Sequence, residues 1–326
     1  MQVRRLGRSG LEVSVLGLGT NAFGGRATAE DSRNVIAAAL EHGITFIDTA
    51  NIYTGGQSET IIGEALAGRR HEAILATKAG LVAGKGPLDR GSSRYHLMRE
   101  LEASLRRLRT DYIDLYQIHT FDPHTPLEET LRTLDDMVRS GKVRYVGASN
   151  YRAWELMKAL AVSDRLGTER YVSVQPSYSL ADRVPEDELV PLCLDQGVGV
   201  IAYFPLAGGL LTGKYAAGQE PPADSRAAKS PAFGRKMLEG EHKMALAQGV
   251  TQIAGELGAT PSQVALAWLI HQPAVSTAIA GATRVSQVED NAKAADVQLD
   301  TGALERLDAL SRPFLLERFD EARLPS

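Results

Sequence analysis

Cysteine is almost absent from this chain of 326 residues, because Cys193 is the only one. A single thiol excludes an internal disulfide and any metal centre built from several cysteines. The chain also has no excess of one charge, since 36 Lys and Arg face 40 Asp and Glu, a formal net charge of −4. The sequence therefore has neither the basic excess of a nucleic-acid-binding protein nor an acidic tail.

Long apolar runs are lacking as well. The longest, residues 198–211, is shorter than the roughly 20 residues that cross a membrane, and glycines and a proline interrupt it. The basic N-terminal segment MQVRRLGRSG is not followed by an apolar region, so we expect no secretory signal and a cytoplasmic protein. With 44% hydrophobic and 23% charged residues, the composition is that of a soluble folded protein.

What the sequence does contain is a short apolar run followed by an amphipathic one, repeated along most of its length. The apolar runs predict eight strands, at 15–18, 44–47, 73–76, 112–117, 143–147, 171–174, 198–202 and 275–279. Apolar residues three and four positions apart predict helices between them, for example at Leu97, Leu101, Leu105 and Leu108. Eight strand–helix units close a barrel, so we predict that residues 1–326 form a single (β/α)₈ TIM-barrel domain.

Two segments fall outside this repeat. Residues 2–14 predict a β-hairpin that plugs the bottom of the barrel. Residues 212–240 are rich in proline, glycine and alanine and form a long insertion after the seventh strand. This insertion is either a flexible surface loop or a lid over an active site, and the sequence leaves both interpretations open.

A glycine-rich segment raises the alternative of an open, doubly wound sheet. Residues 17–22, GLGTNA, match the loose glycine pattern of dinucleotide-binding folds. That pattern requires a helix to begin inside it, where the helix N-terminus binds pyrophosphate. Here the next helix is expected to begin only near the capping signal at Thr28, so the barrel is favoured.

Polar residues stand where the predicted strands end. They are Asp48, Lys78, His119, Ser149, Asn150, Gln175 and Tyr203, and Tyr53 follows shortly after the first of them. Active sites of such barrels lie at the C-terminal ends of the strands. Each residue alone has an ordinary explanation, such as a helix cap or a solvated cation. Together they predict a site in which the charge of one side chain shifts the pKa values of its neighbours.

Several segments resemble the aldo-keto reductase superfamily, and the resemblance covers nearly the whole chain. The segments are GLGTNAFGG, FIDTANIYTGGQSE, LATKAG, LEASLRRLRTDYIDLYQIH, GKVRYVGASN, YFPLAGGLLTGKY and IAGATRVSQVEDNAKA. The chain looks like the bacterial or channel-β-subunit branch of that superfamily. The resemblance implies a (β/α)₈ barrel, NADP(H) bound across its mouth, and reversible reduction of aldehydes or ketones to alcohols by hydride transfer.

The resemblance also assigns catalytic roles. It makes Tyr53 the general acid and base, Lys78 and Asp48 its electrostatic partners, and His119 the group that orients the carbonyl. A phenol titrates near pH 10 in water, so a nearby Lys78 ammonium is expected to lower the pKa of Tyr53. His119 can hydrogen-bond the substrate oxygen while negative charge develops there.

Cofactor contacts implied by the resemblance fall into three groups. Strand-end polar residues and the Tyr203 ring suit the nicotinamide, the segment 204–214 with Arg226 suits the pyrophosphate, and the segment 281–291 suits the adenosine and its 2′-phosphate. Arg284 near a helix N-terminus favours NADPH over NADH. The expected contacts are Gly19, Thr20, Asn21, Asp48, Ser149, Asn150, Gln175, Tyr203, Phe204, Pro205, Leu206, Gly209, Lys214, Arg226, Gly281, Thr283, Arg284, Gln287, Asp290 and Asn291.

The substrate is expected to be a small carbonyl compound or alcohol. Its apolar pocket is predicted from Phe23, Tyr53, His119 and Phe121. We predict no metal site, because the spacing of His119, Asp122 and His124 matches no standard ligand pair. The sequence is compatible with a homo-oligomer, although it identifies no interface.

Two other functions fit part of the sequence. A barrel aldolase would use Lys78 as a Schiff-base nucleophile, but that chemistry leaves the GATRVSQVEDN and GASN segments unexplained. Alternatively, relatives in the same superfamily serve as cofactor-holding subunits of membrane channels, where bound nicotinamide reports the redox state. Tight cofactor binding with little turnover would indicate that role.

Overall fold

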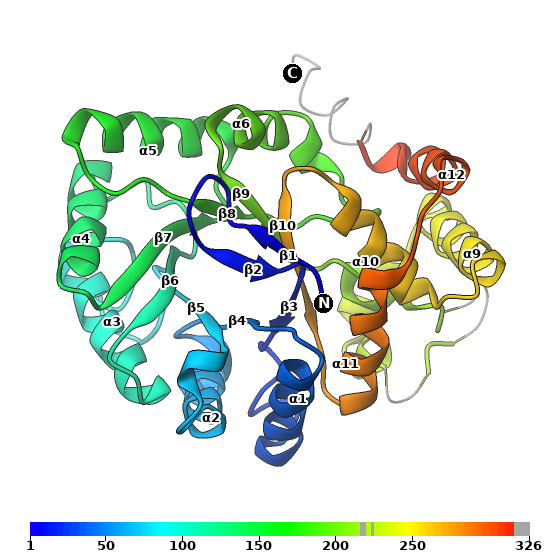
Figure 1. Cartoon of the computed structure of the whole chain (residues 1–326), viewed down its shortest axis with the longest axis horizontal. Helices are drawn as coiled ribbons and strands as arrows, with labels where there is room; N and C mark the ends of the chain where they lie inside the picture. Colours follow the sequence, from blue (N-terminus) through cyan, green and yellow to red (C-terminus); the bar gives the residue numbers. More distant parts are fainter. Residues whose placement is uncertain (216–219, 223–224, 316–326) are drawn as a thin grey trace.

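Eight parallel strands close into a barrel in this computed structural model, in the order β10-β3-β4-β5-β6-β7-β8-β9. The structure describes residues 1–215, 220–222 and 225–315. Figure 1 shows the strands at the centre and the helices around them. The strands are β3 (Leu16–Gly19), β4 (Phe46–Asp48), β5 (Ile74–Ala79), β6 (Ile113–Ile118), β7 (Val143–Ser149), β8 (Ser173–Gln175), β9 (Gly199–Ala202) and β10 (Val275–Gly281). The predicted barrel is confirmed, with strand boundaries displaced by a few residues at most.

Helices connect successive strands and cover the outside of the barrel. They are α1 (Ala29–Glu41), α2 (Gln57–Ala65), α3 (Arg94–Leu108), α4 (Leu127–Arg139), α5 (Ala153–Leu166), α6 (Leu189–Gln196), α9 (Glu241–Glu256), α10 (Pro261–His271), α11 (Val285–Ala292) and α12 (Thr301–Ser311). The leucine stripe predicted in α3 is buried against the barrel. α1 begins where expected, because the Thr28 hydroxyl accepts a 3.1 Å hydrogen bond from the backbone N–H of Asp31. No helix begins within residues 17–22, so the doubly wound alternative is wrong.

The N-terminal hairpin plugs one end of the barrel, as predicted. Its strands β1 (Val3–Arg5) and β2 (Glu12–Ser14) pair antiparallel. Leu6 and Val13 join an apolar layer inside the barrel together with Phe46, Ala76, Leu115, Ile201 and Ile279. Gly7 has a φ of +58°, and a Cβ there would lie 2.5 Å from the carbonyl oxygen of Gly197, so only glycine fits this turn.

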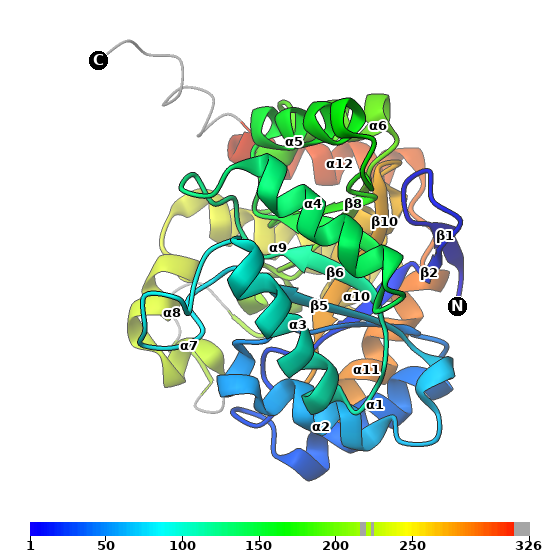
Figure 2. The same cartoon turned by 90° about the vertical axis from the view of Figure 1, so that its left-hand side faces the viewer.

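The insertion after β9 lies at the opposite end of the barrel from the hairpin (Figure 2). It follows a 3₁₀ turn, η4 (Ala207–Thr212), and its described part includes two short helices, α7 (Arg226–Lys229) and α8 (Pro231–Leu238). The Phe233 ring packs so closely on η4 that a Cβ on Gly208 would lie 2.6 Å from it. The helices of the insertion therefore pack on the segment that follows β9, which favours the lid interpretation over a flexible surface loop.

Candidate active site

A cavity of about 780 Å³ opens at the C-terminal ends of the strands, on the side of the insertion. Most of the residues predicted to form the site line it. Those residues are Gly19, Thr20, Asn21, Asp48, Tyr53, His119, Ser149, Asn150, Gln175, Tyr203, Phe204, Pro205, Leu206, Gly209, Lys214, Gly281, Thr283, Arg284 and Gln287. Lys78 lies just behind this wall and is fully buried. The closed barrel thus brings together residues that are far apart in the sequence.

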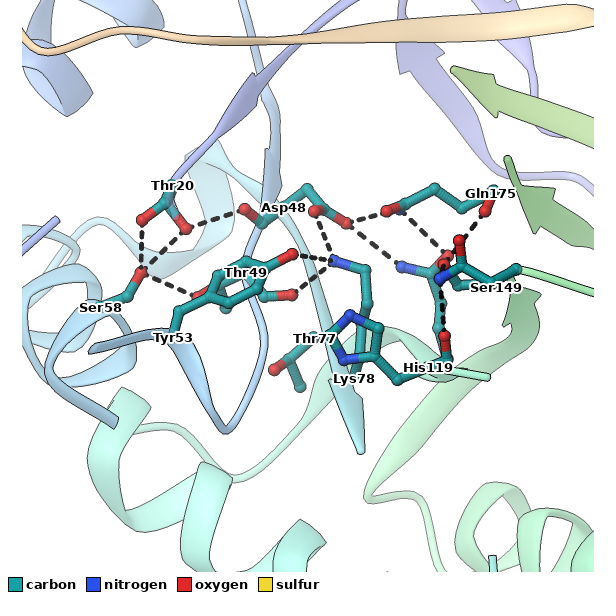
Figure 3. Close-up of polar contacts among 12 residues, drawn as sticks. Thr20, Asp48, Thr49, Tyr53, Ser58, Thr77, Lys78, His119, Ser149 and Gln175 are labelled. Atoms are coloured by element: carbon teal, nitrogen blue, oxygen red, sulfur yellow. Dashed lines mark hydrogen bonds and ion pairs between the residues drawn. The ribbon is translucent and has the colours of Figure 1, made fainter. Parts of the chain in front are cut away.

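Lys78 is the centre of the polar contacts at the floor of this cavity (Figure 3). Its Nζ lies 2.5 Å from Asp48 Oδ2, 2.8 Å from the Thr49 carbonyl oxygen and 3.5 Å from the Tyr53 hydroxyl. Asp48 and Lys78 are interior residues on adjacent strands, β4 and β5. The ammonium therefore bridges a carboxylate and a phenol in a region closed to solvent.

Tyr53 is presented by a sharp turn after β4. Three successive residues after it, Thr54, Gly55 and Gly56, have positive φ angles, which glycine accepts readily. Thr54 tolerates its φ of 49° because its hydroxyl donates a 2.6 Å hydrogen bond to the Phe23 carbonyl oxygen. This turn directs the phenol toward Lys78 and His119, as Figure 3 shows.

Buried hydroxyl groups support the strand end that carries Asp48. Ser58 Oγ contacts Thr49 Oγ1 and Thr20 Oγ1, each at 2.9 Å. Thr20 Oγ1 in turn donates to the Asp48 carbonyl oxygen at 2.8 Å. These bonds join the first turn of α2 to the ends of β3 and β4, and Figure 3 shows them at its left-hand side, beside Tyr53. They satisfy groups that would be costly to bury alone.

The pKa of Tyr53 differs from the sequence-based expectation, whereas that of Lys78 agrees with it. Burial raises the pKa of the Tyr53 phenol above its ordinary value, and the Lys78 charge offsets only part of that rise. The expected lowering of this pKa is therefore wrong for the protein without ligands. Burial alone would lower the pKa of Lys78, but the Asp48 carboxylate and the Tyr53 hydroxyl raise it overall. The site holds a neutral phenol beside a charged ammonium at neutral pH.

His119 follows β6 and faces the Tyr53 ring edge to face, with ring centroids 6.0 Å apart. Burial, assisted by the Lys78 charge, lowers the pKa of His119 to about 3. The imidazole is therefore neutral near pH 7. Its Nδ1 atom is buried and has no hydrogen-bond partner among the residues that the structure describes.

Amide and hydroxyl groups line the cavity next to Tyr53 and His119. Ser149 Oγ donates to the Gln175 carbonyl oxygen at 3.0 Å, and Asn150 Nδ2 donates to the His119 carbonyl oxygen at 2.9 Å. The Tyr203 hydroxyl donates to Asn150 Oδ1 at 2.8 Å. The Tyr203 ring thus has a fixed orientation at the cavity wall, and Phe204 beside it is 39% exposed.

Cations line the far side of the cavity. Besides Lys214 and Arg284, they include Arg26 and Lys229, which the sequence analysis did not identify. An amide-lined floor with an aromatic ring, followed by several cations, is a donor set that fits a dinucleotide with its phosphates. Gln287 Oε1 accepts a 2.8 Å hydrogen bond from the Thr283 backbone N–H, which ties the first turn of α11 to the segment just before Arg284.

Four predicted contacts lie away from the cavity. Phe23 has 0% exposure and belongs to the core, so it cannot line the substrate pocket. Phe121 packs edge to face on Tyr151 and Trp154 and is absent from the cavity wall. Two predicted adenine contacts, Asp290 and Asn291, are also absent from that wall.

Asp290 has a structural partner instead of an adenine contact. It accepts hydrogen bonds from the Thr260 hydroxyl and from Gln263 Nε2, and so anchors the start of α10. Asn291 is buried on the same helix. The side chain of Arg226, predicted to contact pyrophosphate, lies outside the described residues.

The other residues of the cavity wall were not predicted from the sequence, and they come from loops, the start of α1, the end of β10 and the insertion. They are Ala22, Arg26, Asp31, Gly208, Thr212, Ser225, Lys229, Ile279, Ala280 and Ala282. Ile279 to Ala282 could have been found, because they end the predicted last strand. Arg26 and Lys229 carry no such signal, since their position depends on how their loops fold.

Comparison with known proteins gives a consistent picture. Residues 15–312 match the model of the Aldo/keto reductase family. An uncharacterized oxidoreductase of Bacillus subtilis (strain 168), YrpG, is 40% identical over 94% of this chain and 95% of its own. A probable voltage-gated potassium channel subunit beta of Arabidopsis thaliana is 38% identical over 91% of this chain and 92% of its own. The aldo-keto reductase YhdN of Bacillus subtilis is 35% identical, with coverages of 89% and 87%.

Proposed function

Because the chain belongs to the aldo/keto reductase family, we propose that it is an NADPH-dependent oxidoreductase that reduces small aldehydes or ketones to alcohols, reversibly. One observation carries the proposal. Lys78 Nζ lies between Asp48 Oδ2, at 2.5 Å, and the Tyr53 hydroxyl, at 3.5 Å, at the floor of a cavity that His119 also lines. In this arrangement Tyr53 is the proton donor, and the Lys78 ammonium places a fixed positive charge next to its hydroxyl.

Tyr53 supplies the proton. When bound, the cofactor supplies the hydride that adds to the carbonyl carbon. The raised pKa keeps the Tyr53 phenol protonated at neutral pH, so it can donate to the oxygen of the forming alcohol. The resulting phenolate would lie next to the Lys78 ammonium, which Asp48 holds in place. In the oxidative direction the same phenolate accepts the proton.

His119 orients the carbonyl. Its pKa of about 3 makes it a neutral hydrogen-bonding group that adds no charge beside Lys78. Edge-to-face contact with the Tyr53 ring keeps the imidazole near the proton donor. A carbonyl oxygen between the two side chains would be polarised before the hydride arrives.

The far side of the cavity suits NADPH better than NADH. Lys214 and Lys229 supply positive charge for the pyrophosphate, and Arg284 at the start of α11 supplies it for a 2′-phosphate. Ser149, Asn150 and Gln175 are the candidates for the nicotinamide carboxamide, with the Tyr203 ring against its face.

A second candidate function comes from the relatives that are named as potassium channel β subunits. In that role the chain would hold the cofactor and turn over slowly. No helix among the described residues is long and apolar enough to cross a bilayer. The aldolase alternative is disfavoured, because a Schiff-base nucleophile must be a neutral amine and the pKa of Lys78 is raised.

Reductase assays distinguish these functions. Loss of the near-ultraviolet absorbance of NADPH would be followed with a panel of aldehydes, ketones and quinones, for the wild type and for Tyr53→Phe. We expect turnover in the wild type and a loss of about a hundredfold or more in the variant, with the NADPH dissociation constant unchanged. NADPH binding without turnover of any carbonyl would favour the channel-subunit role. Near-normal turnover by Tyr53→Phe would overturn the mechanism.

A further inference from the structure

Gln117 is a fully buried polar residue that neither the proposed chemistry nor the cavity wall includes. It lies on β6, directly beside Lys78 in the register of β5 and β6. Leu115, two residues earlier on the same face, belongs to the apolar layer above the hairpin plug. Gln117 therefore sits between this apolar layer and the floor of the active-site cavity.

Its amide makes bonds to two residues of the cavity floor. Gln117 Nε2 donates to Asp48 Oδ1 at 3.2 Å. Gln175 Nε2 donates to the same Oδ1 atom at 2.8 Å and approaches Gln117 Oε1 at 3.3 Å. A carboxylate only accepts hydrogen bonds, so both amides must turn their N–H groups toward Asp48. The three side chains form a closed ring of contacts.

The strand order explains how Gln117 reaches Gln175. These residues stand on β6 and β8, and β7 lies between them. The β7 residue paired with Gln117 is Gly147, which has no side chain. A Cβ on Gly147 would lie 3.4 Å from Gln117 Cγ and 2.5 Å from Ser173 Oγ. The amide of Gln117 can therefore cross β7 inside the barrel.

The ring joins two parts of the site with different tasks. Asp48 Oδ2 holds the Lys78 ammonium, while its Oδ1 holds the two amides. Gln175 lines the cavity where the nicotinamide carboxamide is proposed to bind. Building on the proposed function, we propose that Gln117 is a positioning residue that fixes Asp48 and Gln175 relative to each other and so couples cofactor binding to proton transfer.

Replacing Gln117 by methionine tests this role, because the side chain keeps its approximate size and loses both polar groups. The measurements are the NADPH dissociation constant by fluorescence, kcat and KM for a carbonyl substrate across pH, and urea unfolding. Leu115→Met, on the same strand and face but outside the ring, is the matched control.

Two changes are expected in Gln117→Met. The NADPH dissociation constant and kcat should each worsen about tenfold, because a hydrogen bond to a charged group is lost and Gln175 is less constrained. The alkaline limb of the pH profile of kcat/KM should move up by about half a pH unit. The Asp48 charge raises the pKa of Tyr53, and losing the Gln117 hydrogen bond to Asp48 would strengthen that effect. Leu115→Met should show neither change.

A second variant covers the case in which Gln117→Met does not fold. In Gln117→Glu the introduced carboxyl group can donate to Asp48 only when protonated. Activity and NADPH affinity should therefore be regained at low pH and lost as that group ionises, a dependence that the wild type should not show.

Three results would overturn the role of Gln117. They are an unchanged dissociation constant together with an unchanged alkaline limb, equal losses in Gln117→Met and Leu115→Met, and a Gln117→Glu variant with the pH dependence of the wild type. If the wild type binds NADPH but reduces no carbonyl, the proposed reductase function fails. The NADPH dissociation constant of Gln117→Met, compared with that of the wild type, then still decides whether Gln117 supports the cofactor site.

Discussion

Lys78 Nζ and Asp48 Oδ2 lie 2.5 Å apart, and the two side chains are 0% and 2% exposed. Both charges are almost completely buried, so each depends on the other and on the few polar groups around it. The pair stands on adjacent strands of the barrel, and Lys78 also contacts the hydroxyl of Tyr53, the proposed proton donor. Its contributions to stability and to catalysis can therefore be separated by mutation.

Lys78→Met should destabilise the protein by about 3–5 kcal/mol, because it leaves the Asp48 carboxylate buried without its counter-ion. The double variant Asp48→Asn with Lys78→Met removes both charges and should regain most of that loss. Urea unfolding measures the stability of each, and reductase assays should find both inactive. Wild-type stability in the single variant would show that the pair is not buried as described.

The low pKa of His119 predicts a loss of stability in acid. In the unfolded chain this histidine binds a proton near its ordinary value of 6.5, whereas the folded protein binds it only near 3. Unfolding therefore takes up a proton between these values, and stability falls by up to about 1.4 kcal/mol for each pH unit below 6.5.

His119→Asn should remove this part of the acid sensitivity. Urea unfolding at several pH values between neutrality and acid measures it, and His124→Asn, at an exposed position, is the control. Parallel stability curves for the wild type and His119→Asn would contradict the buried, neutral imidazole.

Alanine substitutions at two glycines should differ in how much stability they cost, because only one of the two lies in the hairpin plug. Gly7→Ala should cost about 3 kcal/mol or more, since its φ is +58° and the new Cβ would meet the Gly197 carbonyl oxygen at 2.5 Å. Gly68→Ala, with a φ of +78° and nothing within 4 Å, should cost only the backbone strain of about 1–2 kcal/mol. Equal losses in urea unfolding would show that the hairpin does not fit tightly against the barrel.

Arg284→Ala tests the choice of cofactor. It should weaken NADPH binding about tenfold and leave NADH binding nearly unchanged, because only NADPH carries the 2′-phosphate. Fluorescence titration with both cofactors measures this. Arg106→Ala, which removes the same charge outside the cavity wall, should alter neither affinity. If Arg284→Ala lowered the affinity for both cofactors equally, Arg284 would contact a part of the cofactor that NADH and NADPH share.

The barrel and the residues at the floor of its cavity could both be predicted from the alternation of strand and helix patterns in the sequence. The alternation of strand and helix patterns identifies each unit, and parallel strands end on the same side, so Asp48, Lys78 and Gln175 had to meet. Loops follow no such rule. Phe23 faces the core although it lies in the loop after β3, and Arg26 faces the cavity from that loop. The expected pKa of Tyr53 is wrong because burial raises it by more than the Lys78 charge lowers it. The sequence pattern places Lys78 near Tyr53, but it does not show how deeply the phenol is buried.

The barrel closes where β10 pairs with β3, with Ala278 beside Leu16. During ribosomal synthesis β3 emerges among the first segments and must wait for β10, which is among the last. Until then β3 and β9 present unpaired backbone edges that other nascent chains could pair with. The period before β10 emerges is therefore when the nascent chain is most exposed to such pairing, and mutations that slow closure of the seam should lower its yield in cells before they affect the folded protein.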